Sequence, residues 1–272
     1  MQSLIGAGLR HAHFPYLSEK PQTVTNWFEI ISENFITTRG YPFEVLMKLR
    51  QDYPIGMHGV SMNLASFEKH DQEYLKKLKE LIELVDPMLV SDHLCWTGKH
   101  NNNLHNLLPF PYIKENLLHV VDKISQAQDY LGRQLLIENL SAYFQVEKQE
   151  FCEWEFLKEV AKKAGCKILL DINNIYVNSQ NQQFNPYVYL DAIDVDLIGE
   201  IHLAGYSDMD NFLFDTHSKP VYPQVWELYK HKIKDCPNVP VLIEWDEDIP
   251  EFPVLDSEVK KALTIWSSHH GK

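Results

Sequence analysis

The sequence predicts a single (β/α)8 TIM barrel, an α/β fold, formed by residues 1–272 as one domain. Three observations support this prediction. Short apolar segments alternate with helical patterns along the whole chain, and no change of composition divides it. The length of 272 residues suits one barrel of this class. The main alternative, a doubly wound sheet, would place three glycines after its first strand, and the stretch from Gly6 to His13 has only two.

Eight segments have the character of strands that are buried on both faces. Each is short and rich in isoleucine, leucine, valine or aromatic residues, as the strands of a parallel sheet are. They cover residues 4–8, 27–32, 54–58, 88–93, 135–139, 167–173, 198–203 and 239–245. Eight strands are what a barrel of this class requires.

Helical patterns fill the intervals between these segments. Residues 71–85 carry apolar side chains at helical spacing, and the pattern stops before Pro87. Residues 111–131 open with a proline and close at Gly132, which is the usual placement of these two residue types around a helix. Further helices are expected at residues 154–164, 225–233 and 257–266. This alternation of strand and helix favours parallel strands that are joined by helical crossovers.

The composition excludes several classes of protein. Apolar residues make up 44% of the chain and charged residues 23%, which are ordinary values for a folded globular protein. The 25 basic and 38 acidic residues leave a net charge of −13, which argues against a nucleic-acid-binding surface. No apolar run approaches the roughly 20 residues that are needed to cross a bilayer. We therefore expect neither nucleic acid nor a membrane as a partner.

The four cysteines lie far apart and form no Cys-x-x-Cys pair. This spacing argues against a zinc ribbon and provides no disulfide framework. The N-terminal residues lack the basic and apolar regions of a signal peptide. These features predict a cytoplasmic protein with free thiols.

Histidines and polar acidic or amide residues occur at the ends of the predicted strands or just after them. Those at strand ends are His58, His93, Glu138, Asp171, His202 and Glu244, and those in the following segments are Asn174, Asp215 and His217. In a barrel the carboxyl ends of all strands meet at one face, where the active sites of this fold lie. We therefore expect these side chains to line a shared pocket.

The acidic residues near the strand ends point to a bound metal. They are Glu138, Asp171, Asp215, Glu244 and Asp246. Converging carboxylates without a counter-charge repel one another strongly in a site of low dielectric constant. The strand ends offer almost no lysine or arginine, and Lys219 is the nearest. A multivalent cation would remove the repulsion, so the sequence predicts a metal site.

The types of ligand narrow the choice of metal. Imidazole nitrogens and carboxylate oxygens, with an amide oxygen from Asn173 or Asn174 and no cysteine cluster, suit iron, manganese or zinc. About nine candidate ligands exceed the need of one ion, which favours two or three ions that share bridging carboxylates. Asp215 and His217 lie on one side of an extended segment, because side chains alternate along it.

The motifs at the strand ends resemble those of the multinuclear non-haem iron-dependent oxidative enzymes (MNIO). This family, formerly of unknown function, includes the methanobactin biosynthesis oxidase. The resemblance runs from about Gly6 to Asp246. The matching motifs are GAGLR (6–10), FEIISEN (28–34), HGV (58–60), SDHL (91–94), IEN (137–139), DINNIYVN (171–178), EIHLAGY (200–206), DTH (215–217) and IEWD (243–246). The resemblance implies a TIM barrel of the xylose-isomerase-like type.

The resemblance also implies a cluster of two or three iron ions in mixed Fe(II)/Fe(III) valence, with O2 as co-substrate. The first ion would be held by His58, His93 and Glu138, with Glu138 bridging. The second would be held by Asp171, His202 and Glu244, which complete the implied catalytic set. The cluster would be closed by Asn174, Asp215 and His217, and Asn173 could take the place of Asn174.

The resemblance implies that the protein is an oxidoreductase. Its substrate would be a ribosomally made precursor peptide, in which it modifies cysteine or another residue. Because the barrel uses nearly all of the 272 residues, we expect a separate small partner protein that presents the peptide. Two other classes of function remain open. One is a divalent-metal sugar isomerase or an endonuclease on the same type of barrel. The other is a metal-binding scaffold without enzyme activity.

Overall fold

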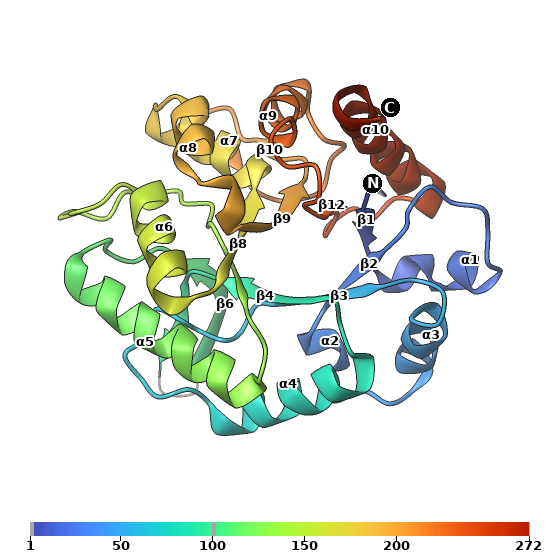
Figure 1. Ribbon diagram of the computed structural model, residues 1–272, viewed down its shortest axis with the longest axis horizontal. Helices are drawn as coiled ribbons and strands as arrows, with labels where there is room; N and C mark the ends of the chain where they lie inside the picture. The colour runs from blue at the N-terminus through green and yellow to red at the C-terminus, as the bar shows by residue number, and fades with distance from the viewer. Residues whose placement is uncertain (1–2, 100–101, 272) are drawn as a thin grey trace.

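The computed structural model describes residues 3–99 and 102–271. Within them, eight parallel strands close a barrel in the order β1-β12-β9-β8-β7-β4-β3-β2 (Figure 1). The strands are β1 (Ile5–Gly8), β2 (Phe28–Ile31), β3 (Ile55–Gly59), β4 (Leu89–His93), β7 (Leu136–Glu138), β8 (Lys167–Asp171), β9 (Ile198–Leu203) and β12 (Val241–Ile243). The predicted (β/α)8 barrel is confirmed, and each of the eight predicted strand segments contributes a strand to it.

Helices surround the barrel and connect its strands (Figure 1). They are α1 (Phe14–Ser18), α2 (Glu33–Ile36), α3 (Tyr41–Leu49), α4 (Gln72–Val85), α5 (Lys114–Leu131), α6 (Glu153–Ala164), α7 (Ile172–Gln182), α8 (Pro186–Ala192), α9 (Pro223–Ile233) and α10 (Phe252–His270). The carboxylate of Asp71 accepts hydrogen bonds from the amides of Glu73 and Tyr74 and so caps α4 where the sequence predicts its start. In the described part of the chain, no helix is both long and apolar enough to cross a membrane.

The loops differ from the sequence prediction in two respects. The helix expected from Pro111 begins at Lys114, and the side-chain amide of Asn116 donates to the carbonyl oxygen of Pro111 instead. The sequence pattern also does not indicate two hairpins that follow barrel strands. They are β5 (Trp96–Lys99) with β6 (Asn102–Leu108), and β10 (Ser207–Asp208) with β11 (Leu213–Phe214). Their strands are very short or rich in asparagine, so no apolar run marks them.

The interior of the barrel has an apolar layer at one end and a polar layer at the other. The apolar layer contains Trp27, Leu136, Leu169 and Leu242, which are buried in one cluster. Two residues further along the same strands stand the buried acidic residues Glu29, Glu138, Asp171 and Glu244. Because side chains alternate between the faces of a strand, residues two apart share the interior. The strands therefore fill the amino end of the barrel with hydrocarbon and gather acidic groups at its carboxyl end.

Candidate metal centre

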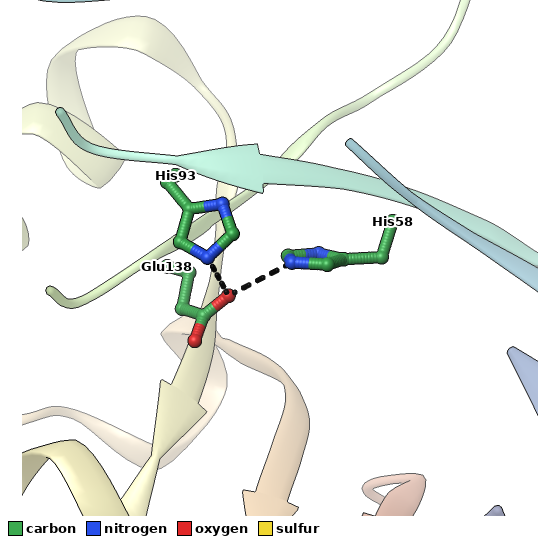
Figure 2. A group of neighbouring side chains, drawn as sticks. All are labelled: His58, His93 and Glu138. Carbon is green, nitrogen blue, oxygen red and sulfur yellow. Dashed lines mark ion pairs between the residues drawn. The ribbon is translucent and has the colours of Figure 1, made fainter. Parts of the chain in front are cut away.

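His58, His93 and Glu138 form the first group of candidate ligands (Figure 2). They lie at the carboxyl ends of the neighbouring strands β3, β4 and β7. Oε2 of Glu138 lies 3.3 Å from Nε2 of His58 and 3.2 Å from Nε2 of His93. All three side chains are buried, and their ligand atoms lie within 4.8 Å of one another. Two imidazole nitrogens and one carboxylate oxygen at this spacing can hold one transition-metal ion.

The two imidazole rings are oriented by hydrogen bonds at their other nitrogens. Nδ1 of His58 lies 2.7 Å from Oγ of Ser91, and Nδ1 of His93 lies 3.1 Å from the carbonyl oxygen of Gly59. Because a carbonyl oxygen only accepts, Nδ1 of His93 carries the proton and Nε2 keeps its lone pair. Burial lowers the pKa of His58 well below its usual value and that of His93 to about 4. Both rings are therefore neutral at pH 7, the form that binds metal.

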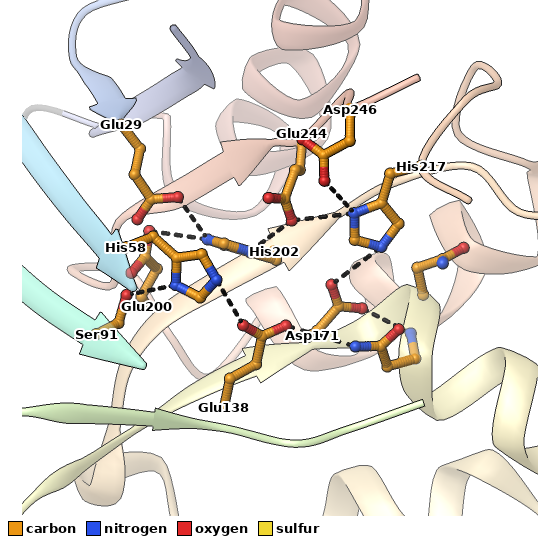
Figure 3. Close-up of polar contacts among 12 residues, drawn as sticks. Glu29, His58, Ser91, Glu138, Asp171, Glu200, His202, His217, Glu244 and Asp246 are labelled. Atoms are coloured by element: carbon orange, nitrogen blue, oxygen red, sulfur yellow. Dashed lines mark hydrogen bonds and ion pairs between the residues drawn. The ribbon is translucent and has the colours of Figure 1, made fainter. Parts of the chain in front are cut away.

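His202 lies among three carboxylates and forms the second group (Figure 3). Its Nε2 lies 3.2 Å from Oε1 of both Glu29 and Glu200, and its Nδ1 lies 3.0 Å from Oε2 of Glu244. Burial alone would lower the pKa of His202, but the three carboxylates together raise it well above its usual value. Burial, assisted by repulsion from Glu200, raises the pKa of Glu29 to about 8. Protons therefore balance the charge of this group when no metal is bound.

His217 belongs to a third group and comes from the segment between β9 and α9. Its Nε2 lies 2.6 Å from Oδ1 of Asp215 and 3.9 Å from Oδ2 of Asp171, and its Nδ1 lies 3.1 Å from Oε2 of Glu244. The φ angle of His217 is +47°, in the left-handed region that few residues other than glycine adopt. The backbone N–H of Asp246 donates to the carbonyl oxygen of His217 at 2.8 Å. This bond holds the segment in a conformation that directs the histidine ring into the barrel mouth (Figure 3).

Asp171 and two asparagines connect the groups at the start of α7. Oδ1 of Asp171 accepts from the backbone N–H of Asn174 at 2.6 Å and caps the helix. The side-chain amide of Asn174 lies 3.4 Å from Oε1 of Glu138, and that of Asn173 donates to Asp215 at 2.7 Å. Burial raises the pKa of Asp171 to about 7. Both asparagines that the sequence offered as amide ligands therefore contact the acidic cluster.

The groups of candidate ligand atoms share residues, and this sharing suits a centre with several metal ions. Glu138, Asp171, His202 and Glu244 each belong to two of the four groups of buried ligand atoms. Several buried polar atoms here have no hydrogen-bond partner within the described chain. They are Oε2 of Glu29, Oδ2 of Asp171, Oδ1 of Asn174 and Oε2 of Glu200. Because an unsatisfied buried polar atom is unfavourable by about 1–3 kcal/mol, more than one cation that shares these oxygens would stabilise the centre.

A cavity of about 170 Å³ opens on the centre. Its polar wall contains His58, His93, Glu138, Asn174, Asp215, His217 and Glu244, and its apolar wall contains Ile31, Val60, Leu107 and Leu140. A larger cavity of about 880 Å³ lies between residues 61–74 and β5, but none of the nine predicted ligands lines it. The smaller cavity is therefore the one in which the chemistry of these ligands can take place.

All nine residues that the sequence predicts as ligands lie in this centre or beside it, but two acidic residues are additional. Glu29 and Glu200 contact His202 from β2 and β9. Their positions in the sequence indicate that they face the barrel interior. Glu29 follows buried Trp27 by two residues, and Glu200 precedes His202 by two. Side chains two apart on a strand share a face, so this spacing could have identified both.

The expectation that the strand ends offer almost no positive charge is wrong. Arg10 lies just beyond β1 and is buried, with Nη2 3.4 Å from Oε1 of Glu244. Its guanidinium also contacts Asp246, with Nε 3.1 Å from Oδ1. Lys219 instead lies at the surface, 3.3 Å from Asp248. Arg10 therefore offsets part of the negative charge, while the carboxylates of the centre still outnumber it.

The amino-acid sequence matches a known family over most of its length. The family profile described as "RiPP precursor modification enzyme MbnB/TglH/ChrH" matches residues 4–267, where RiPP denotes a ribosomally synthesised and post-translationally modified peptide. The chain is 46% identical to a UPF0276 protein of Acaryochloris marina over 264 residues, which are 97% of this chain and 95% of that protein. It is 44% identical to a UPF0276 protein of Anaeromyxobacter sp. over 261 residues, 96% of this chain and 92% of that protein.

Solved structures with low sequence identity share the fold. A D-psicose 3-epimerase from Clostridium cellulolyticum superimposes with a TM-score of 0.63 and 12% identity, covering 97% of this chain and 99% of that one. Endonuclease IV from Thermus thermophilus superimposes with a TM-score of 0.59 and 16% identity, with the same coverage. These similarities show a xylose-isomerase-like TIM barrel and nothing about the reaction. The profile match and the close relatives show that this chain belongs to the MbnB/TglH/ChrH family, the MNIO enzymes whose motifs it resembles, which modify RiPP precursor peptides.

Proposed function

We propose that the protein is an oxidoreductase that uses two or three iron ions, in mixed Fe(II)/Fe(III) valence, and O2 to oxidise cysteine, or another residue, in a precursor peptide. The observation that carries this proposal is the sharing of Glu138, Asp171, His202 and Glu244 between overlapping groups of buried ligand atoms. Shared carboxylates are suited to bridging several ions. Membership in a family of RiPP precursor modification enzymes supports the choice of a peptide as substrate.

The ligand sets that we propose are those that the family resemblance implies, and the first of them coincides with a group of neighbouring ligand atoms in the structure. One ion would be held by His58, His93 and Glu138, a second by Asp171, His202 and Glu244, and a third by Asn174, Asp215 and His217. The mixture of imidazole nitrogens and carboxylate oxygens without thiolates suits iron. When bound, iron supplies one-electron redox chemistry with O2.

Residues around the centre can offset the charge of an anionic substrate and hold the candidate ligands in place. A cysteine thiolate would add negative charge to a mouth that already contains several carboxylates. Arg10, in contact with Glu244 and Asp246, offsets part of that charge. Ser91 and Gly59 hold the rings of His58 and His93 in place, so the ligand geometry does not have to be assembled when substrate arrives.

We further propose that residues 1–272 act as one domain in the cytoplasm and receive the peptide from a small partner protein. The strands and helices of the barrel extend from Ile5 to His270. Within the described residues, this leaves little chain for a separate peptide-binding domain. The four cysteines are free in the structure, which agrees with a reducing compartment.

Metal analysis of protein that is purified without O2 tests the proposal. We expect more than one iron per chain, and O2 uptake when a cysteine-containing peptide encoded beside the gene is added. The same protein loaded with zinc is the matched control and should consume no O2, because zinc has no redox chemistry. A single zinc per chain, with no gain of activity after iron reconstitution, would contradict the proposal.

A further inference from the structure

Three exposed aromatic rings lie together at the barrel mouth. Tyr143 belongs to the loop between β7 and α6, and Phe212 and Phe214 belong to the β10–β11 hairpin. The rings of Tyr143 and Phe214 are stacked with centroids 4.8 Å apart, and Phe212 meets them edge-on at 6.0 and 6.2 Å. Their exposed fractions are 41, 42 and 39% for Tyr143, Phe212 and Phe214. We call these three residues the aromatic shelf.

The hairpin directs its two phenylalanines outward and the leucine between them inward. Leu213, between them, packs against the main hydrophobic core. Its backbone N–H and carbonyl group both bond to the side chain of Asn181 in α7 at 2.9 Å. Because side chains alternate along an extended segment, this anchoring turns Phe212 and Phe214 away from the core. The exposed rings are therefore held on a fixed support.

The aromatic shelf is joined directly to the candidate metal centre. The backbone N–H of Asp215 donates to the hydroxyl oxygen of Tyr143 at 3.0 Å, and Oγ of Ser141 lies 3.2 Å from that hydroxyl. Asp215 and Ser141 both line the cavity of about 170 Å³. This volume corresponds to only about six water molecules at roughly 30 Å³ each. A peptide can therefore place little more than its reacting residue inside, and its neighbouring residues must lie on the rim.

We infer that the aromatic shelf binds a bulky apolar side chain, preferably aromatic, of the precursor peptide close to the residue that is modified. This inference rests on the proposed function, which makes a peptide the substrate of this mouth. An added ring can stack on the shelf or meet it edge-on, as aromatic side chains prefer. The exposed area of the three rings, roughly 250 Å², suits one such side chain. It is far below the roughly 800 Å² per partner of a stable protein interface, which argues against a second copy of the chain as the occupant.

Short synthetic peptides test the inference without any turnover. The probes are eight-residue peptides of serine and glycine with a serine at the reacting position and one phenylalanine at successive positions around it. A matched peptide has serine in place of phenylalanine. Saturation-transfer NMR with the full-length chain measures binding. We expect at least one phenylalanine peptide to bind roughly ten-fold more tightly than its serine counterpart, as one buried aromatic side chain allows.

Variants locate the binding. The double variant Phe212→Ser, Phe214→Ser should lose this preference, and Phe212→Ser alone should weaken it if the double variant does not fold. Tyr130→Ala is the matched control, because Tyr130 is an exposed aromatic residue in the last turn of α5, which leads to the amino end of β7. An unweakened preference in a folded Phe212→Ser chain would overturn the inference. So would a dimer of the native chain that this substitution dissociates.

The binding measurement requires neither iron nor O2, so it separates the two proposals. A chain that prefers the phenylalanine peptide but does not oxidise cysteine peptides would refute the proposed function and leave the aromatic shelf in place. A chain that oxidises cysteine peptides but binds phenylalanine and serine peptides equally would refute the aromatic shelf alone. With a substrate that is turned over, the shelf variants should raise KM about ten-fold and leave kcat unchanged, because the rings do not touch the reacting atoms.

Discussion

Arg10 and Asp246 form an ion pair that joins the loops after the first and the last strand of the barrel. Nε of Arg10 lies 3.1 Å from Oδ1 of Asp246, which is 236 residues further along the chain. The strands that precede these loops, β1 and β12, are hydrogen-bonded neighbours. The backbone N–H of Asp246 also donates to the carbonyl oxygen of His217. The ion pair therefore supports the segment that carries one of the candidate ligands.

Replacing Arg10 by glutamine should destabilise the metal-free protein more than the metal-loaded one. Without the guanidinium, buried Glu244 loses a positive partner, and the free energy of unfolding should fall by roughly 3 kcal/mol. Bound cations would supply the missing charge. Urea unfolding of both forms measures the difference. Lys20→Gln, which removes an exposed ion pair with Asp52, is the control and should change stability by less than about 1 kcal/mol. An equal loss in both forms would show that Arg10 has no electrostatic link to the metals.

Replacing Glu138 by glutamine should remove more than one metal ion per chain. Glu138 contacts His58 and His93 on one side and shares a second ligand group with Asp171 and His202. A neutral amide is a poor bridge between cations, so both neighbouring positions should weaken. Metal analysis of the purified variant checks this expectation, and activity should fall with the metal content.

Glu153→Gln is the matched control for this variant. Burial raises the pKa of Glu153 to about 7, and its carboxylate contacts Asn178 instead of the candidate ligands. This variant should therefore keep its full metal content. A Glu138→Gln protein with the same metal content as Glu153→Gln would assign Glu138 a structural role only.

The strands and the convergence of most candidate ligands could be predicted because both depend on local patterns. Apolar runs of four to eight residues mark strands buried on both faces, and the carboxyl ends of parallel strands meet wherever a barrel closes. His58, His93 and Glu138 each stand at such an end, so their convergence follows from the fold class. His217 was harder to predict as a candidate ligand, because it lies in a segment without an apolar run. Only its spacing of two residues from Asp215 pointed to it.

The charge balance and the loops could not be predicted in the same way. Arg10 lies beyond the end of β1, and only the closed barrel brings it beside Glu244. The β10–β11 hairpin is held by its bonds to Asn181 in α7, a long-range contact that the local sequence does not reveal. Interactions between distant segments decide these features, and periodicity carries no information about them.

The metal-free protein should lose stability as the pH rises from about 6.5 to 8. Burial raises the pKa of Asp171 to about 7 and that of Glu29 to about 8, whereas carboxyl groups of an unfolded chain titrate near 4. Over this interval the folded chain binds protons that the unfolded chain has lost, so stability falls with rising pH. The raised pKa values of His202 and His217 act in the same direction. The lowered pKa of His93, about 4, affects stability only below about pH 6.5.

Thermal unfolding at pH 6.5 and pH 8 measures this effect, which should amount to about 1–2 kcal/mol for each carboxyl group. Metal binding displaces these protons, so the loaded protein should show a smaller fall or none. Glu29→Gln removes one of the titrating groups and should flatten the curve of the metal-free protein. An unchanged slope in this variant would mean that Glu29 is already ionised in the folded chain at pH 6.5.

Replacing His217 by asparagine should remove a ligand and leave the fold intact. Asparagine tolerates the left-handed backbone that His217 adopts with φ of +47°, so the chain should still fold. The thermal midpoint of the metal-free protein should nevertheless fall, because buried Glu244 and Asp215 lose a positive partner. Its short amide cannot replace an imidazole nitrogen between Asp215 and Glu244, so metal affinity should fall at least about ten-fold and O2 uptake with it. His231→Asn is the control. His231 lies on α9, outside the centre, and is likewise paired with an aspartate, Asp191. Normal iron content and O2 uptake in the His217 variant would exclude this residue from the cluster and argue for two ions in place of three.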